Sequence, residues 1–288
     1  MRTDSWHQVS VKFPDPTRAE DFAVAHLTPI FTMAEADRLI SAWFFIRKTP
    51  EWRVRYLASP ETTGARAYIL GRLFTLRRNE HIEQATDVIY EPEFRAFGGV
   101  QAMEISHRLW HVDSRHVLAH LARTASEPAV RRRREISVLL YSAMMRAAGL
   151  DWYEQGDVWA KVAEHRDPPD DLDPVKCSEL RVSLRQLMGV DLGSLASPGA
   201  HFPIAAEWAA SFAATGRNLA HLASAGVLRR GLREVLVQQI IFAMNRLGLH
   251  ATTQALLATT AAAVVFDPDP TVGLTIPRPF GSSPEGDG

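Results

Sequence analysis

The sequence of 288 residues predicts an α+β fold, with a ferredoxin-like (split βαβ) sheet in residues 1–97 and a mainly helical part in residues 98–266. Before residue 98, short β-prone runs alternate with helical patterns. After Gly98-Gly99, apolar residues recur at helical spacing almost to the end. We expect a single domain over residues 1–266, in which residues 167–174 (DPPDDLDP) form a proline-rich, acidic connector and no internal repeat is found.

The first part contains four strand-like and two helical segments. The first run, WHQVSVKF, alternates apolar and polar residues as a half-buried strand does, and AWFFIR and WRVRYL form a hairpin around the turn KTPE. Pro29 is expected to interrupt the first helix. The strands are predicted at residues 6–13, 42–47, 52–57 and 82–90, and the helices at residues 19–40 and 62–78.

The second part is predicted to be helical throughout. Its helices are expected at residues 100–121, 127–148, 157–165, 175–188, 203–225, 228–247 and 252–265. Asp113 and Ser114 are expected to break the first of these helices, and Gly149 to end the second. The last residues, 267–288, are rich in proline, glycine and serine and predict a flexible tail.

Composition limits the classes of partner and compartment. The net charge of −1 provides no field that would attract nucleic acid or an anionic membrane. The single cysteine, Cys177, excludes an internal disulfide framework and a cysteine-rich metal site. No apolar run reaches the roughly 18 residues of a membrane span, and the first residues are too polar for a signal peptide. We therefore expect a cytoplasmic protein.

Histidines form two pairs at i,i+4 spacing, which is a zinc-ligand spacing. They are His107 with His111, and His116 with His120. No third ligand accompanies either pair, so we expect no metal. No other cofactor is expected either. His111 is instead a candidate general acid or base, because imidazole titrates near neutral pH.

Charged residues give further candidates, each with two interpretations. Arg53 and Arg55 share one face of a predicted strand, so they either line a site or face water. Glu93 follows the last strand and is either functional or an ordinary surface carboxylate. The run from Arg131 to Arg134 is either a solvated face or a contact for an acidic leader peptide. Gly98-Gly99 favours a tight turn over a phosphate cradle.

Four stretches resemble one family, the stand-alone "thiopeptide-type bacteriocin biosynthesis" proteins, which are related to the C-terminal domain of lantibiotic dehydratases and to thiopeptide pyridine synthases. The stretches are AWFFIRKTPEWRVRYL, YEPEFRAFGGVQAMEISHRLWHVDSRHVLAHL, REISVLLYSAMMRAAGLDWYEQGDVWAKVAEHR and IIFAMNRLGL. DWYEQGDVW is the most specific of their motifs. The resemblance implies an enzyme that matures ribosomally made peptides.

Two reactions are associated with that family, and departures from its motifs favour one of them. Glutamate elimination domains resemble "P-E-x-x-R-Y-G-G" and "H-M-x-x-N-R", whereas this chain has Ala96 at the arginine position and Ile241 at the histidine position. The resemblance therefore favours the second reaction, a formal aza-[4+2] cycloaddition of two dehydroalanines with loss of water and leader peptide. Because Arg53 and Arg55 are retained, glutamate elimination remains an alternative, and a non-catalytic binding partner is a third.

The resemblance also assigns roles to individual residues. Glu93 is the first candidate for proton transfer, with His111 and Tyr153 as further catalytic candidates. Arg53, Arg55, Asn245 and Arg246 are candidates for binding the substrate peptide. The implied partner is a leader-bearing precursor peptide, and a split dehydratase subunit and a homodimer stay open. No membrane and no nucleic acid are expected as direct partners, with tRNA entering only through a partner protein.

Overall fold

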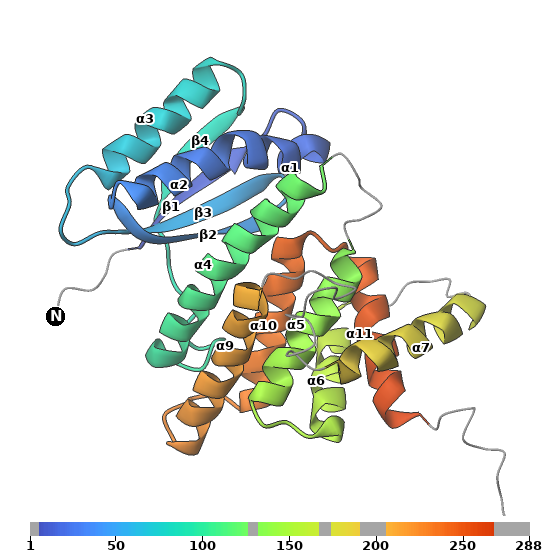
Figure 1. The fold of residues 1–288 in the computed structure, drawn as a ribbon. Coiled ribbons are helices and arrows are strands. Elements are labelled where there is room, and N and C mark those ends of the chain that lie inside the picture. Colours follow the sequence, from blue (N-terminus) through green and yellow to red (C-terminus); the bar gives the residue numbers. More distant parts are fainter. Residues whose placement is uncertain (1–5, 126–131, 167–173, 191–205, 268–288) are drawn as a thin grey trace, which may run out of the picture.

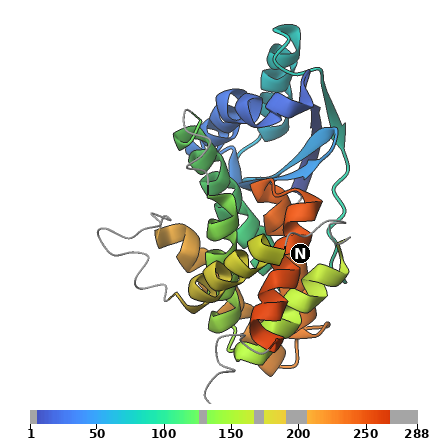
Figure 2. The same ribbon diagram turned by 90° about the vertical axis from the view of Figure 1, so that its right-hand side faces the viewer.

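The computed structural model describes residues 6–125, 132–166, 174–190 and 206–267 (Figure 1). Its first part consists of a sheet with helices on one face, and its second part is a bundle of helices below the other face (Figures 1 and 2). The strands are β1 (Trp6–Lys12), β2 (Ile40–Lys48), β3 (Glu51–Ala58) and β4 (Gln84–Val88). The helices are η1 (Pro16–Arg18), α1 (Ala19–Phe22), η2 (Ala23–Leu27), α2 (Thr28–Ala36), α3 (Ala65–Arg78), α4 (Val100–Arg123), α5 (Arg133–Ala147), α6 (Trp152–Glu164), α7 (Pro174–Gly189), α9 (Ala206–Ser224), α10 (Leu232–Leu247) and α11 (Ala251–Phe266).

The sheet has the order β2-β3-β1-β4, and every neighbouring pair of strands is antiparallel. The predicted α+β class is confirmed in this form, as a small antiparallel sheet followed by helices. Val9 and Val11 of β1 face α1 and α2 with the apolar side chains of β3, while Gln8 and Ser10 face the other way. Alternation along the strand therefore places a polar row on the face that looks toward the helical part.

The first helical segment begins and ends close to the predicted bounds but is not regular. Residues 23–27 form a π-helical turn between α1 and α2, and its last residue lies two positions before Pro29. Pro29 lies in the first turn of α2 and the chain stays helical from Ala19 to Ala36, so the expected interruption takes the form of the π-helical turn.

The helix α4 connects the two parts of the molecule, because it packs against β2 at one side and against α9 and α10 at the other (Figure 1). The break predicted at Asp113 and Ser114 is wrong: α4 continues through both residues, which are buried. The Ser114 hydroxyl accepts a hydrogen bond from the Phe45 N–H, and Asp113 binds side chains of α9 and α10. Because both side chains bind these distant partners, they do not bind nearby backbone groups, which is how Asp and Ser interrupt helices and why a break was predicted.

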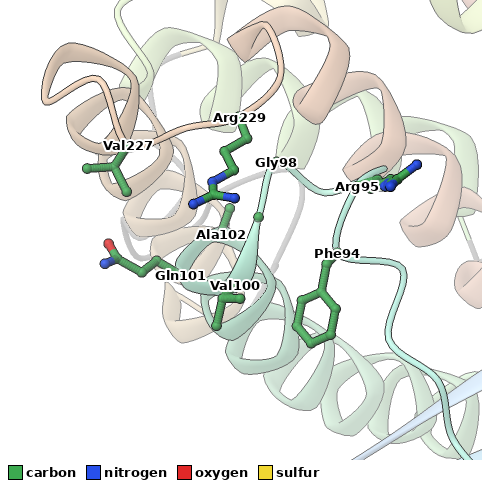
Figure 3. Close-up of a pocket in the computed structure, with 9 residues that line it drawn as sticks. Phe94, Arg95, Gly98, Val100, Gln101, Ala102, Val227 and Arg229 are labelled. Atoms are coloured by element: carbon green, nitrogen blue, oxygen red, sulfur yellow. The ribbon is translucent and has the colours of Figure 1, made fainter.

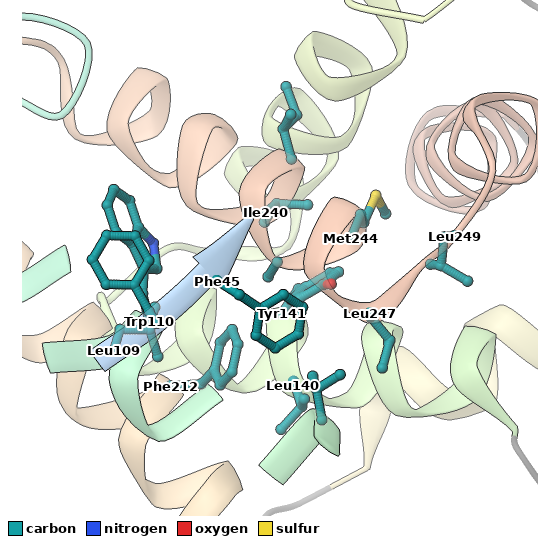
Figure 4. Packing of buried hydrophobic residues seen from close by; sticks show 14 of the residues in the cluster. Phe45, Leu109, Trp110, Leu140, Tyr141, Phe212, Ile240, Met244, Leu247 and Leu249 are labelled. Atoms are coloured by element: carbon teal, nitrogen blue, oxygen red, sulfur yellow. The ribbon is translucent and has the colours of Figure 1, made fainter. Parts of the chain in front are cut away.

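The remaining helices pack closely around a common core (Figure 4). Phe45 of β2, Trp110 of α4, Tyr141 of α5, Phe212 of α9 and Met244 of α10 all contribute to it. The sheet and the bundle therefore share one continuous apolar interior.

A glycine sets the distance between α5 and α9. A Cβ atom at Gly216 would lie 2.1 Å from the Met144 carbonyl oxygen, so only glycine allows the two helices to approach this closely.

Several predicted bounds are wrong in detail. The helix predicted to start at residue 157 begins at Trp152, because Asp151 and Glu154 form a reciprocal capping box. The helix predicted from residue 62 begins at Ala65, the strand predicted at 82–90 is limited to Gln84–Val88, and α10 begins at Leu232. The predicted helix starts at residues 127 and 203, Arg131, the acidic connector at 167–173 and the tail beyond residue 267 lie outside the described residues.

Candidate active site

Arg55 is the centre of a polar cluster on the sheet face that looks toward the helical part. It lies on β3 opposite Gln8 of β1, and its side chain is 6% exposed. The Arg55 Nε donates a hydrogen bond of 2.6 Å to the Gln8 Oε1, and the guanidinium carbon lies 4.1 Å from the centre of the Tyr90 ring. Because the side chain is buried, Arg55 does not face water; that it lines a site remains a prediction.

Tyr90 and His107 form the second half of the cluster. Tyr90 follows β4, and its hydroxyl lies 2.8 Å from the Nε2 of His107 on α4. The His107 ring packs against Trp6, with 4.5 Å between ring centres, and stacks on Phe44. The aromatic walls fix the imidazole in the orientation that meets the phenol.

Burial keeps both members of this pair neutral at pH 7, and the Arg55 charge adds to this effect for His107 alone. Burial raises the pKa of Tyr90 to about 12, against the opposing effect of Arg55. Burial, together with repulsion from Arg55, lowers the pKa of His107 to about 4. Burial also lowers the pKa of Arg55, which stays protonated. The cluster therefore presents a permanent cation beside a neutral phenol–imidazole pair.

Two of the predicted residues lie at the edge of this cluster. Glu93 is exposed, and its charge acts on both Arg55 and Tyr90, raising the pKa of each. Arg53 is half-buried two residues before Arg55, on the same face of β3, and repels its charge. Glu93 and Arg55 are therefore close enough to Tyr90 for their charges to act on it, while Arg53 acts on Arg55.

His111 lies elsewhere, against the outer edge of β2. Its Nδ1 is 3.2 Å from the Trp43 backbone nitrogen and 3.0 Å from the Trp43 oxygen, and its Nε2 is 3.4 Å from the Glu35 Oε1. Both ring nitrogens are engaged by groups that belong to the fold. A catalytic role for His111 remains a prediction, and the observed contacts are those of a residue that covers a sheet edge.

The other three predicted residues, Tyr153, Asn245 and Arg246, contact partners outside the Arg55 cluster. Tyr153 is 66% exposed on α6 and stacks on Phe266. Asn245 accepts a hydrogen bond from Gln254 of α11. Arg246 is fully buried, and its Nε donates a hydrogen bond of 2.6 Å to the Asp113 Oδ2. Its charge reaches Arg55, whose pKa it lowers, but its guanidinium lies inside the molecule.

Of the two predicted histidine pairs, His107 and His111 have different partners, whereas His116 and His120 both lie against Trp208. His107 meets Tyr90, and His111 meets Trp43, so the two rings have different partners. His116 stacks on Trp208. Over the described residues, no group of three or more His, Cys, Asp or Glu side chains is arranged to hold a metal ion. Within the same residues, no helix combines the length and apolarity that crossing a membrane requires.

Sequence reasoning missed three residues of the cluster, Gln8, Tyr90 and His107. Gln8 could be found, because it alternates with apolar residues on a strand that pairs with β3. Tyr90 and His107 are separated by a turn and by the start of α4, so their contact depends on the angle at which that helix packs. No spacing in the sequence gives this angle.

The arrangement can hold a peptide carbonyl or carboxylate and transfer a proton beside it. A guanidinium provides two parallel donors to such groups. A neutral phenol donates a proton, and the imidazole bonded to it orients the hydroxyl. These are general acid–base functions, and Glu93 adds an exposed carboxylate at the edge of the Arg55 cluster.

Comparisons with known proteins place the chain in a family. The sequence profile described as "Lantibiotic biosynthesis dehydratase C-term" matches residues 6–265. No curated protein sequence matches the chain.

Solved structures of low sequence identity share its fold. One is the tRNA-dependent lantibiotic dehydratase MibB from Microbispora sp. 107891, at TM-score 0.64 and 19% identity, covering 92% of this chain. The chain spans only 28% of the length of that protein. TsrL is similar at TM-score 0.59 and 15% identity, over 91% of this chain and 98% of its own. The pyridine synthase TbtD from thiomuracin biosynthesis gives 0.59 and 16%, over 91% and 97%.

At these identities the solved structures establish a common fold. The profile covers nearly every residue that the structure describes, including the Arg55 cluster. The chain therefore belongs to the family of lantibiotic biosynthesis dehydratase C-terminal domains.

Proposed function

We propose that this protein matures a ribosomally made, post-translationally modified peptide by joining two dehydroalanines in a formal aza-[4+2] cycloaddition. The observation that carries the proposal is the neutral Tyr90–His107 pair beside the buried Arg55 guanidinium. Cycloaddition needs an amide to take its imidic form, and it needs two alkenes held in contact. It needs neither a metal nor a nucleotide.

Each member of the cluster has a role in this reaction. Glu93 accepts the proton of the amide N–H, and Tyr90 donates a proton to the carbonyl oxygen of the same amide. The proton that Glu93 has taken up later returns to the Tyr90 oxygen, which restores both groups, while His107, bonded to the Tyr90 hydroxyl, holds that hydroxyl in position. Arg55 holds a neighbouring carbonyl of the peptide and so orients the imidic diene toward the second dehydroalanine. Loss of water and of the leader as an amide then completes the six-membered nitrogen ring.

Two further observations support this reaction. TsrL and the pyridine synthase TbtD are matched over almost their whole length, whereas the dehydratase MibB is matched over about a quarter of its length. Ala96 and Ile241 stand where the elimination motifs have arginine and histidine, and neither side chain can carry charge or a proton.

Glutamate elimination is the second candidate, because Arg53 and Arg55 lie on one face of β3. In that reaction a base removes the Cα proton of a glutamylated serine or threonine, and the two guanidinium groups hold the departing carboxylate. His107 would be the base. A protein with this activity would be the elimination component of a split dehydratase.

Mass spectrometry of two synthetic precursors separates the candidates. We expect a leader-bearing bis-dehydroalanine peptide to give a ring-containing product and an intact leader amide, and a glutamylated precursor to stay unchanged. Conversion of only the glutamylated precursor would establish elimination instead. Binding of both peptides with no mass change would make the protein a non-catalytic partner and overturn the proposal.

The variant that tests the role of Arg55 is Arg55→Gln, which keeps a hydrogen-bond donor to the peptide but removes the positive charge. We expect product formation to fall by about 100-fold, the size of effect that loss of one positioned charged donor has in other enzymes. A matched change at Arg77, an exposed residue in the last turn of α3, should leave the rate unchanged.

A further inference from the structure

The sheet face that looks toward the helical part carries two cross-strand pairs of hydrogen-bond donors. Gln8 of β1 lies opposite Arg55 of β3, and Ser10 lies opposite Arg53. All four side chains are on the same face, because side chains two apart on a strand point the same way. The Ser10–Arg53 pair therefore repeats the Gln8–Arg55 pair two residues farther along both strands, and Ser10 has no part in the reaction proposed above.

The Ser10–Arg53 pair presents donors that the fold itself does not use. Ser10 is 9% exposed, yet its hydroxyl forms no hydrogen bond with the described residues. Arg53 is half-buried and forms no ion pair with them, not even with Glu51, two residues before it on the same face. The charges of Arg53 and Arg55 also repel each other. A ligand that supplies oxygen acceptors would satisfy the donors and reduce this repulsion.

The spacing of the two pairs fits an extended peptide. Residues two apart on a strand are about 6.4–6.8 Å apart, and the same repeat separates the carbonyl oxygens on one side of any extended chain. An extended segment that lies along β1 and β3 can therefore direct one carbonyl at Arg55 and the next carbonyl of the same side at Arg53. A small anion would need only one pair, so the repetition favours a peptide.

The second pair can be reached from the β4 side of the sheet. β4 is an edge strand next to β1, and its Thr86 lies opposite Ser10 and is exposed. The Thr86 hydroxyl accepts a hydrogen bond of 3.0 Å from the Gln84 side chain. The polar row that begins at the half-buried Arg53 therefore ends in solvent at this edge.

The second pair is separate from the cavity of about 600 Å³ at the start of α4. That cavity is lined by residues before α4, by its first turn and by the loop before α10, among them Phe94, Val100 and Arg229 (Figure 3). Neither Ser10 nor Arg53 belongs to this lining. A peptide contact at the second pair is therefore distinguishable by mutation from any contact in the cavity.

We propose that Ser10 and Arg53 form a second carbonyl-binding subsite, which holds the substrate peptide extended along the sheet, two residues away from the carbonyl that Arg55 holds. The inference rests on the proposed function only in taking the ligand to be the peptide that is cyclised. A chain held at two points loses most of its freedom to rotate, so the second subsite orients the dehydroalanines as well as binding the chain.

Fluorescence anisotropy measures the binding without requiring turnover. The probe is a fluorescein-labelled, leader-bearing peptide in which alanine replaces one of the two dehydroalanines, so that it cannot cyclise. We expect Arg53→Gln to weaken binding about ten-fold and Ser10→Ala about five-fold. Arg53→Lys, which keeps the charge but not the planar pair of donors, should fall between the parent protein and Arg53→Gln. Arg77→Gln, at an exposed position on α3, should leave the Kd unchanged.

Removal of single carbonyls from the probe identifies the contact. In a series of probes, one peptide bond at a time is replaced by an alkene, which keeps the shape of the bond but lacks the carbonyl oxygen. At one position we expect the replacement to weaken binding to the parent protein about five-fold, and to have no effect on the double variant Ser10→Ala/Arg53→Gln. The adjacent carbonyl points to the other side of an extended chain, so its replacement should affect both proteins equally.

The proposal is overturned if every alkene position costs the double variant as much affinity as it costs the parent protein, with both proteins folded by circular dichroism. Binding by Arg53→Gln that equals that of the parent protein would also overturn it. If the carbonyl-specific loss is found but the reactive bis-dehydroalanine peptide gives no ring, the proposed reaction is wrong and the second subsite stands.

Discussion

His107 is a buried titratable residue whose environment determines its charge. It is 8% exposed, and Trp6, Phe44 and Trp110 surround its ring. The Arg55 charge adds to the cost of protonation. An imidazole held neutral in this way stays uncharged throughout the physiological range, so it remains a neutral hydrogen-bond partner of the Tyr90 hydroxyl.

The lowered pKa of His107 predicts a pH dependence of stability. The unfolded chain binds a proton at this residue below about pH 6.5, whereas the folded protein does so only below about pH 4. The free energy of unfolding should therefore fall by up to about 3 kcal/mol between pH 6.5 and pH 4 on account of His107. Urea unfolding of the parent protein and of His107→Asn at both pH values measures it, and an equal loss in the two proteins would refute the assignment.

At the scale of single elements, the strand β2 shows how a sheet edge is protected. β2 is an edge strand, and side chains of α4 bind its backbone: His111 at Trp43 and Ser114 at Phe45. His111 and Ser114 are about one helical turn apart on α4, and the residues whose backbone they bind, Trp43 and Phe45, are two apart on β2. This match fixes the helix to the strand and thereby fixes the position of His107 over the sheet.

His111→Ala should lower stability and leave the reaction intact. Removal of the ring leaves a part-buried backbone group of Trp43 without its partner, at a cost of about 1–3 kcal/mol. Chemical denaturation measures the loss, and product formation per folded molecule should stay within about three-fold of the parent. A variant that is fully stable but inactive would show instead that His111 takes part in the reaction.

The elements themselves could largely be predicted from sequence. WHQVSVKF and WRVRYL alternate as strands do, and each became a strand with its polar residues on one face. The prediction failed at Asp113-Ser114, where local preference indicated a cap and tertiary partners kept the helix intact. The start at Trp152 was missed although Asp151 and Glu154 carry the capping-box pattern in the sequence.

At the scale of the whole molecule, one buried ion pair joins three helices. Asp113 of α4 binds Arg246 of α10 through one oxygen and the Trp208 indole of α9 through the other. Both charged side chains are essentially inaccessible, and the two terminal nitrogens of Arg246 have no hydrogen-bond partner among the described residues. The geometry of the bundle depends on this pair, because either charge left alone would be buried without compensation.

Asp113→Ala should destabilise the protein by about 3–5 kcal/mol, since it leaves the Arg246 charge buried and unpaired. The double variant Asp113→Leu/Arg246→Met removes both charges and should recover a large part of that loss. Guanidinium unfolding midpoints compare the three proteins. If the double variant is less stable than the single one, apolar replacement is not tolerated and the interpretation of the pair is wrong.

The site was less predictable than the fold because it depends on how α4 packs against the rest of the molecule. Arg55 and Glu93 could be singled out because their types and places on a strand and a loop were informative. Arg246 carries the same chemical group, but its burial against Asp113 follows from the packing of α4 on α10. His107 and His111 are equivalent by spacing, and only the position of α4 gives one of them Tyr90 and the other a strand edge.

The most direct measurement of the central claim is the rate at which Tyr90→Phe converts the leader-bearing bis-dehydroalanine peptide, followed by mass spectrometry beside the parent protein and His111→Ala. Loss of the phenol removes the proton donor and the partner of His107 while keeping the ring over Arg55. The account predicts a fall of at least 100-fold for Tyr90→Phe. A rate for Tyr90→Phe equal to that of the parent protein would contradict it.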